Sequence, residues 1–379
     1  MDQVSEPVIG ESSIELAREV LIHGPISRSE LGRRLGLSPA SLTRLSKPFL
    51  DRGLFIEAPE EHTRTVGRPT RPLDVRVDAR RFVGVKITGT DVLGVRTDLR
   101  ATEQASASRH LDEPSVDHVV SQIADVVTEL GGAAAFSAIG VSIGGNVAGG
   151  RVVTRAPFLG WRGVDLATEL ERVIGIPAVI ENDVVALTGA EHWFGAGRGI
   201  PNFAVVTIGA GVGYGLVIHD RVVVTADTGL GLGGHFPLDP SGPLCLEGHR
   251  GCATAMLSIP SICAQVGIAL DRSVSYEDVL ALAAEGNIPA LTVLRSAGRA
   301  LGRLLAAVAN LAMLDTVVLS GEGLGLWPLA RAEVDAAIAA DRDPEASPLT
   351  VVHDLSDFSA WARGAAAVAI QATLARLHV

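Results

Sequence analysis

The spacing of apolar residues changes along the chain, and near its start it is helical. Five apolar residues share one face of a first helix predicted over residues 12–23: Ile14, Leu16, Ala17, Val20 and Leu21. Ser27 and Glu30 have the spacing of a capping box, which predicts the start of a second helix. Gly36 is expected to end that helix, because glycine adopts the left-handed backbone conformation without strain.

A third helix is predicted to begin after Ser38, with Pro39 in its first turn, where the missing N–H costs no hydrogen bond. Two short helices joined by a tight turn are the helix-turn-helix pattern. Leu42 and Phe49 are expected to pack inward, and Pro48 to kink or break the helix. The outward side chains are then predicted to contact DNA bases and phosphates, and they are Ala40, Ser41, Thr43, Arg44 and Lys47.

Residues 54–73 are expected to form a wing, which ends in the extended segment Gly67-Arg68-Pro69. An arginine presented in this way suits a narrow minor groove, and Arg64, Arg68 and Arg71 complete the predicted DNA-contacting set. Residues 28–71 carry nine basic side chains against five acidic ones, although the whole chain has a net charge of −11. This distribution indicates localised phosphate contact. The alternative for the three helices is an interaction module with a solvated basic face. The alternative for Gly67-Arg68-Pro69 is a plain linker.

From residue 81 onward, short β-rich runs alternate with glycine-rich turns and longer helices. The predicted strands are 82–85 and 92–97, which form a hairpin, and 138–143, 178–181, 203–208, 215–219 and 316–320. The clearest predicted helices are 116–130 and 289–313. Mixed strands and helices over this length indicate an α/β body in two lobes.

Composition narrows the class of protein. With 47% hydrophobic and 4% aromatic residues over 379 positions, the chain is globular and rich in small aliphatic side chains. Residues 1–15 contain four acidic residues and no apolar core, so they do not resemble a signal peptide. The charge-free run 131–150 contains seven glycines, which suits a buried strand and turn better than a membrane helix. Three cysteines argue against a disulfide framework, and a cytoplasmic protein without a membrane partner is expected.

The densest group of chemically distinctive residues lies between positions 233 and 252. His235, Cys245 and Cys252 are three zinc-type ligands in one short loop, with Glu247 as the expected fourth ligand and His249 as a less favoured one. Zinc accepts sulfur, imidazole and carboxylate ligands in a tetrahedral shell, so this loop can fold around one structural ion. The alternative is an ion-free loop with two reduced cysteines.

The spacing of this loop resembles the signature of the ROK family (repressors, open reading frames and kinases), in which Gly-His precedes Cys-x-Cys-Gly-x-x-Gly-Cys-x-Glu. Glu247 stands in place of the second cysteine and Thr254 in place of the final glutamate. The resemblance implies an α/β fold, with a winged helix-turn-helix over residues 1–76 and a two-lobed actin-like/RNase H-like body over 77–379. The small lobe would span about 80–190 plus the C-terminal helix, and the large lobe about 191–362.

The resemblance also implies a site for a sugar. In the family's kinases an Asn-Asp pair holds the sugar and takes its proton, and here these residues are Asn182 and Asp183. A glycine-rich turn without Cβ obstruction would approach phosphate or sugar oxygens. The predicted effector-binding residues are Lys86, Asn182, Asp183, Gly209, Gly211, Gly213 and His235.

Several positions depart from the pattern of the kinases. Lys86 replaces the acid of the first phosphate loop, and Phe158, Leu232 and Thr254 replace polar side chains that would contact a sugar. Unpaired buried polar groups are costly, so the pocket suits a phosphorylated or less polar sugar, or no ligand. No residue is therefore expected to be catalytic, and Asp183 is interpreted as a vestigial base.

These observations predict a transcriptional regulator, a repressor, that binds operator DNA through residues 27–71 and responds to a carbohydrate-like effector in the cleft between the lobes. Operators with two-fold symmetry make a homodimer or homotetramer the expected assembly. Two alternatives are a sugar kinase fused to a DNA-binding domain, and a DNA-binding protein that needs no effector. Lys86 argues against the kinase, and Phe158, Leu232 and Thr254 favour the effector-independent protein over an ordinary hexose sensor.

Overall fold

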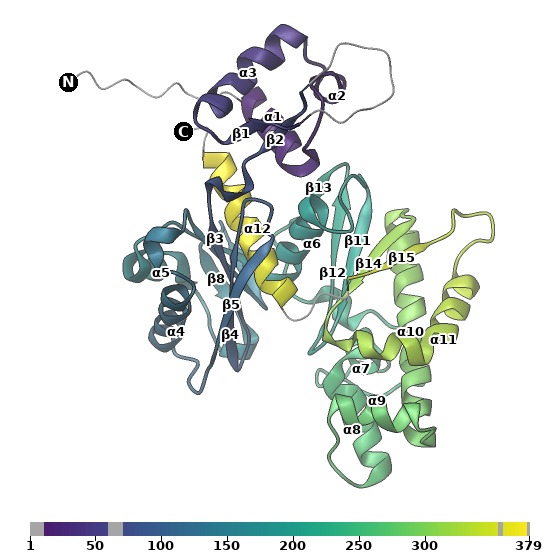
Figure 1. The fold of residues 1–379 in the computed structure, drawn as a ribbon. Coiled ribbons are helices and arrows are strands. Elements are labelled where there is room, and N and C mark those ends of the chain that lie inside the picture. Colours follow the sequence, from purple (N-terminus) through teal and green to yellow (C-terminus); the bar gives the residue numbers. More distant parts are fainter. Residues whose placement is uncertain (1–10, 60–70, 355–358, 377–379) are drawn as a thin grey trace. The chain divides into compact units, whose positions relative to one another are not determined.

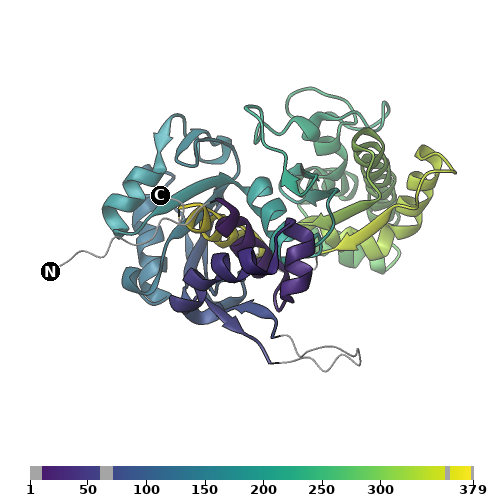
Figure 2. The same ribbon diagram turned by 90° about the horizontal axis from the view of Figure 1, so that it is seen from above.

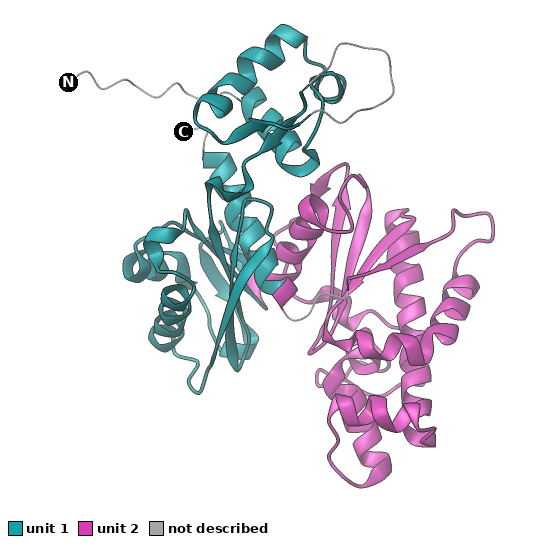
Figure 3. Ribbon diagram, viewed as in Figure 1, with its two compact units in different colours: residues 1–143, 147–181, 361–379 teal, residues 144–146, 182–360 magenta. Residues whose placement is uncertain are grey.

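The chain forms two compact units in a computed structural model that describes residues 11–59, 71–354 and 359–376. Unit 1 comprises residues 1–143, 147–181 and 361–379, and unit 2 comprises residues 144–146 and 182–360 (Figure 3). The N-terminal module and the first part of the body thus share one unit, and the predicted boundaries at residue 76 and between the lobes stay predictions. Among the described helices, none combines the length and the apolar character needed to span a bilayer.

The N-terminal module of unit 1 contains three helices, α1 (Glu11–His23), α2 (Arg28–Leu35) and α3 (Pro39–Asp51), and a two-stranded antiparallel sheet, β1 (Phe55–Glu57) and β2 (Leu73–Val75). The predicted helix ends are confirmed. Ser27 and Ser38 each accept a backbone N–H at the start of a helix, and Gly36 ends α2 with a φ of 63°. The capping box is only half formed, because the Glu30 carboxylate binds Arg33 and Arg34 instead of returning to the backbone.

The expectation of a break at Pro48 is wrong, because α3 continues through this residue to Asp51. Pro48 lies in the last turn of the helix, so its missing N–H removes a hydrogen bond only where the helix is about to end. The adjacent Phe49 is buried and stacks on Phe55 of β1, with ring centroids 4.7 Å apart. This packing anchors the last turn of α3 on the sheet.

The sheet of unit 1 has the order β10-β6-β3-β4-β5. Its strands are β3 (Phe82–Ile87), β4 (Asp91–Thr97), β5 (Glu103–His110), β6 (Ile139–Ile143) and β10 (Ala178–Asn182). The predicted hairpin is confirmed, since β3 and β4 pair antiparallel, whereas β3 and β6 are parallel. Helices α4 (Val116–Glu129) and α5 (Leu166–Ile174) lie on one face and α12 (Ser359–Arg376) on the other (Figure 1). A smaller sheet contains β7 (Asn146–Ala148), β8 (Val152–Arg155) and β9 (Val164–Asp165).

Two glycines let α12 approach the sheet. Gly84 of β3 and Gly140 of β6 are register partners, so they form one flat patch on the face that α12 covers. A Cβ atom at Gly84 would overlap with the backbone of Ala362 and Ala366, and one at Gly140 with the carbonyl of Ala365. Helix and sheet are therefore in backbone contact here. The C-terminal turns of α12 reach the N-terminal module, beside α1, in both views (Figures 1 and 2).

Unit 2 repeats this design in a sheet of order β13-β12-β11-β14-β15. Its strands are β11 (Phe203–Ile208), β12 (Val212–Ile218), β13 (Arg221–Val222), β14 (Thr316–Ser320) and β15 (Thr350–His353). The first three form an antiparallel meander, and β14 and β15 continue the sheet in parallel with β11. Helix α6 (Asp183–Phe194) contacts β11 and β12. The other described α-helices of unit 2 are α7 (Ala253–Leu257), α8 (Ile259–Leu270), α9 (Tyr276–Ala284), α10 (Ile288–Ala312) and α11 (Trp327–Asp341). Two such sheets are the duplicated design of the predicted actin-like/RNase H-like fold.

Candidate functional site

Helix α3 presents a polar and basic face. Ala40, Thr43, Arg44 and Lys47 are exposed and Ser41 is half-buried. Leu42 and Phe49, each 1% exposed, pack inward as predicted. The short side chains hold the helix start, because the Ser41 backbone N–H donates to Ser38 and the Thr43 hydroxyl donates to the Pro39 carbonyl. The face is thus formed on a helix whose own hydrogen bonds are satisfied.

Most basic side chains near α3 already have acidic partners. Arg28 lies 2.7 Å from Glu57, and Arg33 and Arg34 share Glu30 at 2.6 and 2.8 Å. The guanidinium groups of Arg33 and Arg34 hold the pKa of the Glu30 carboxyl below its usual value. By contrast, Arg44 and Lys47 make no ion pair with any described residue. They are therefore the positively charged side chains of α2 and α3 that are available to contact a ligand.

The wing falls mostly outside the described residues. Arg64 and Arg68 belong to the segment 60–70, which the structure does not describe. Arg71 lies at the edge of that segment and is exposed, with one guanidinium nitrogen 3.7 Å from Glu57. The two strands that flank the segment pair in antiparallel register, Phe55 with Val75, which holds the ends of the predicted wing together.

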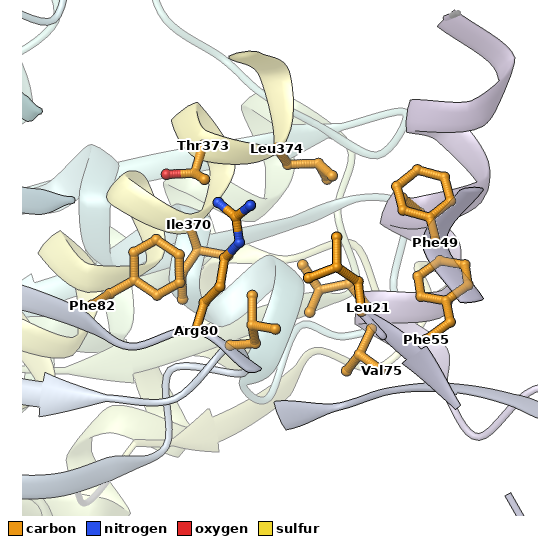
Figure 4. A pocket seen from close by; sticks show the side chains of 12 residues that line it. Leu21, Phe49, Phe55, Val75, Arg80, Phe82, Ile370, Thr373 and Leu374 are labelled. Atoms are coloured by element: carbon orange, nitrogen blue, oxygen red, sulfur yellow. The ribbon is translucent and has the colours of Figure 1, made fainter. Parts of the chain in front are cut away.

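Arg100, which follows β4, fastens the N-terminal module to the rest of unit 1. Its guanidinium donates to the carbonyl oxygens of Leu21 and Val20 at the end of α1, at 3.0 and 3.3 Å, and pairs with Asp74 of β2 at 2.5 Å. Beside this contact lies an apolar cavity of about 50 Å³ (Figure 4). Its labelled lining joins the module to the body: Leu21, Phe49, Phe55, Val75, Arg80, Phe82, Ile370, Thr373 and Leu374. Sequence reasoning missed this junction, and nothing in the local pattern at Arg100 indicates it.

Lys86 is buried in β3, with 6% of its surface exposed. Its ammonium lies 5.0 Å from the centre of the Trp361 ring of α12. The backbone carbonyl of Trp361 accepts a hydrogen bond from Ser142 on the neighbouring strand, at 3.1 Å. A cation over an indole face is stabilised by the ring quadrupole, and more so when water is excluded. The lysine thus has a structural contact of its own within unit 1.

Asn182 and Asp183 mark the start of α6 in unit 2. The Asn182 side chain caps the helix, accepting the N–H groups of Val184 and Val185 at 3.0 and 3.1 Å. Its amide also donates to the Gly145 carbonyl at 2.8 Å. This buried side chain is therefore used in holding the turn, whereas the half-buried Asp183 carboxylate accepts the Val184 N–H at 2.9 Å.

The glycine-rich turn between β11 and β12 lies close to the start of α6, because a Cβ atom at Gly213 would lie 2.7 Å from Val184. Within the turn, the Gly209 N–H donates to the Gly211 carbonyl at 2.9 Å. A carboxylate oxygen of Glu322 lies directly against Gly209, in the space a side chain would need. Glu322 is exposed and follows β14, which is parallel to β11. An acidic group thus stands where an anion would approach the turn.

Sequence reasoning did not single out Glu322, although a signal was available. The carboxyl ends of parallel strands meet at the same edge of a sheet. Gly209 follows β11 and Glu322 follows β14, both within two residues of the strand end. An acid flanked by glycines after a buried strand was the pattern to notice.

Phe158, Leu232 and Thr254 stand where the family's kinases are expected to have polar side chains that contact a sugar. The first two are apolar and exposed to solvent. Phe158 is 66% exposed and Leu232 is 62% exposed. Thr254 instead uses its hydroxyl to bind the Gly234 carbonyl at 2.8 Å, next to His235. Lys86 and Phe158 belong to unit 1, whereas Asn182, Asp183, the glycine-rich turn and His235 belong to unit 2.

The metal-type residues of unit 2 come together around His235. The ligand atoms of His235, Cys245 and Cys252 all lie within 4.8 Å of one another. Both sulfur atoms lie 3.8 Å from His235 Nδ1. Burial raises the pKa of the Cys252 thiol, and a bound cation would reverse this by binding the thiolate. Two sulfurs and an imidazole nitrogen are the donor types that zinc prefers, so the residues present fit this ion.

Comparison with known proteins gives one family. A sequence model of the ROK family matches residues 82–372. The chain is 25% identical over 332 residues to the xylose repressor of Bacillus subtilis, covering 85% of this chain and 86% of the repressor. It is 32% identical over 187 residues to a glucokinase of Thermotoga maritima, covering 48% of this chain and 58% of the kinase. The crystal structure of a ROK family transcriptional regulator, a homologue of the Escherichia coli MLC protein, matches with a TM-score of 0.80 and 25% identity over 97% of both chains. Repressors and sugar kinases therefore both occur among the relatives.

Proposed function

The chain belongs to the ROK family, and we propose that it is a transcriptional repressor that binds operator DNA through a winged helix-turn-helix. The observation that carries the proposal is the outer face of α3, where Arg44 and Lys47 are exposed and without ion-pair partners among the described residues. The similarity to a repressor and to a solved transcriptional regulator over most of the chain supports the same function.

In this proposal α3 enters the major groove, where its first turns contact base edges. Arginine binds the O6 and N7 atoms of guanine through two hydrogen bonds, so Arg44 is the side chain best suited to read a base. Ser41 and Thr43 supply short polar contacts beside it, and Lys47 neutralises a phosphate. Arg68 is proposed to reach the minor groove or a phosphate, with Arg64 and Arg71 beside it.

Two matched arginine substitutions test this assignment. Arg44→Ala in the full chain should cost roughly 1–3 kcal/mol of binding to a duplex selected for wild-type binding, and should relax the preferred sequence. Arg33→Ala removes the same charge from α2, but Arg33 is already paired with Glu30, so the preferred sequence should not change. Binding isotherms by fluorescence anisotropy measure both. Equal losses on all sequences for the two variants would mean that α3 does not read bases.

We infer that the body responds to a carbohydrate-like effector. The relatives point to sugars, since one is a xylose repressor and another a glucokinase. Asp183 and the glycine-rich turn offer polar groups at the same end of α6, while Asn182 holds the turn. An effector changes DNA affinity only by binding two arrangements of the protein unequally. Because operators are commonly symmetric, we propose a homodimer or homotetramer as the binding species.

We propose a structural zinc ion in the loop 235–252. His235, Cys245 and Cys252 would hold it, and the ion would fix the imidazole of His235 and the loop that carries it. Elemental analysis of protein purified without added metal or chelator should find about one zinc per chain. Protein that contains no zinc would refute the proposal.

We infer that the chain is not a sugar kinase. Phosphoryl transfer depends on Mg²⁺ and on neutralising the charge of the phosphates. Lys86, held against Trp361, offers no oxygen ligand for Mg²⁺, and the Glu322 carboxylate beside Gly209 repels a phosphate at the turn. Asp183 keeps the chemistry of a base, but a base alone contributes only about 10²–10⁴-fold.

A further inference from the structure

His249 lies against two of the three residues that form the proposed zinc site, and we propose that His249, rather than Glu247, is the fourth ligand of the zinc ion. This inference rests on the zinc site proposed above. His249 Nδ1 lies 3.1 Å from His235 Nδ1 and 3.6 Å from Cys245 Sγ. The two sulfur atoms each lie 3.8 Å from His235 Nδ1. Ligand atoms from both histidines and both cysteines are therefore gathered around one nitrogen.

Four of the six separations match those of a tetrahedral zinc shell, although His249 lies outside the group of three residues whose ligand atoms are all within 4.8 Å of one another. Zinc bonds of about 2.0–2.1 Å to nitrogen and 2.3 Å to sulfur place two nitrogens about 3.3 Å apart, and a sulfur and a nitrogen about 3.6 Å apart. The observed distances between nitrogens and between sulfur and nitrogen lie within a few tenths of an ångström of these values. Two thiolates and two neutral imidazoles also balance the charge of Zn²⁺, whereas a carboxylate in the fourth position would leave a net negative charge.

Glu247 approaches His235 from the other side of its ring. Its carboxylate lies 3.8 Å from His235 Nε2, whereas the other ligand atoms gather at Nδ1. It also lies 3.5 Å from Cys245 Sγ, which places it beside the site. An imidazole that binds a metal through one nitrogen commonly directs its other N–H to a carboxylate, which fixes the ring orientation. At 3.8 Å the carboxylate is too far from Nε2 for a hydrogen bond, so in this proposal Glu247 would close on this nitrogen and orient His235 when the ion binds.

The backbone brings His249 to this position through a tight turn. The Cys245 N–H donates to the His249 carbonyl at 2.9 Å, and the Gly248 N–H donates to the Cys245 carbonyl at 3.0 Å. Gly248 has a φ of 84°, which favours glycine. Cys245 and His249 therefore face each other across the turn. His249 is exposed, so its ring can turn toward Cys252 to close the shell around an ion.

Cobalt substitution and metal competition in the full-length protein test the assignment. The variants are His249→Gln and Glu247→Gln, both at exposed positions of the same turn. Glu247→Gln should weaken zinc binding about 10–100-fold, as the loss of a partner outside the ligand shell does, and should keep the tetrahedral cobalt absorption. His249→Gln should lose more affinity than this and should shift the cobalt absorption, because a water oxygen replaces a nitrogen in the fourth position of the tetrahedral shell. His249→Cys should restore tight binding and strengthen the thiolate-to-cobalt absorption, because a third sulfur enters the shell.

The possible outcomes separate the two proposals. If wild-type protein holds no zinc and binds no cobalt, the zinc site itself is absent and this inference falls with it. If the wild type binds zinc and His249→Gln keeps both affinity and spectrum, only the role of His249 is refuted. A cobalt spectrum that shifts in Glu247→Gln and stays unchanged in His249→Gln would make Glu247 the ligand.

Discussion

Single charged residues decide what chemistry the body can support. Lys86 is buried beneath Trp361, and the Glu322 carboxylate lies against Gly209 at the mouth of the glycine-rich turn. By the resemblance to the family's kinases, Lys86 stands where a metal-binding acid is expected, and Glu322 lies where a phosphate would approach the turn. In the proposed function both charges would oppose phosphoryl transfer.

The protein is therefore expected to show no sugar kinase activity. Incubation of the full chain with ATP, Mg²⁺ and a panel of hexoses and amino sugars should give no phosphorylated product. Turnover near roughly 1–100 s⁻¹, the usual range of kinases, would contradict the expectation. Lys86→Asp combined with Glu322→Gly is the companion variant, since activity recovered there would show that these two charges were the obstacle. Lys86→Met is its control, because it removes the charge without supplying a metal ligand.

At this scale the sequence predicts residue types better than residue partners. The clustering of His235, Cys245 and Cys252 could be predicted because the three share one short loop. The preference for Glu247 over His249 rested on its place in the cysteine motif. The sequence alone does not indicate the direction from which each side chain reaches His235, because the turn at Gly248 sets that direction. The proximity of Glu322 to Gly209 depends on the pairing of two distant strands.

At the scale of elements, the contact between α12 and its sheet depends on small residues. The register pair Gly84 and Gly140 lies against Ala362, Ala365 and Ala366, with no space for a Cβ atom. Close packing of backbone on backbone maximises dispersion contacts but leaves no tolerance for added volume. This helix also reaches the cavity at the N-terminal module through Ile370. The packing of α12 on the sheet thus helps to hold the N-terminal module in place.

Gly84→Ala should therefore lower the free energy of unfolding of unit 1 by about 1–3 kcal/mol or more, because the added methyl group forces α12 away from β3. Gly89→Ala is the matched control. Gly89 lies on the loop after β3, and a Cβ atom there would first meet the Phe158 carbonyl at 3.5 Å, an ordinary contact distance. Its effect should stay within about 0.5 kcal/mol. Urea unfolding followed by circular dichroism measures both, and equal stabilities would contradict this account of the packing.

Elements with strong local signals could be predicted, and those defined by tertiary contact could not. The helices at 12–23, 116–130 and 289–313 and the hairpin that begins at Phe82 appear where the periodicity placed them. Strand β15 carries a weak pattern because it is a short edge strand, and α12, which is alanine-rich around its circumference, is expected only from the family resemblance. The prediction of a break at Pro48 fails because the effect of a proline depends on how close it lies to the end of its helix.

At the scale of the whole molecule, the proposed function requires that this chain recognise a specific DNA sequence. The net charge of −11 makes uniform coating of DNA unfavourable, so we expect binding to come from the basic face of the N-terminal module. Arg100 ties that module to the rest of unit 1 by three contacts, through which a ligand-dependent change would reach the proposed DNA-binding face. The duplicated sheets supply the body in which an effector would act.

Sequence-specific binding can be measured by selection from a random duplex library with the full-length protein at physiological salt. One sequence should be enriched, with symmetric half-sites separated by about one helical turn, 10–10.5 base pairs, or a multiple of it. The protein should bind this sequence at least about 10³-fold more tightly than a scrambled duplex of the same composition. No enriched sequence, with equal affinity for selected and scrambled duplexes, would contradict the assignment of this chain as a sequence-specific repressor.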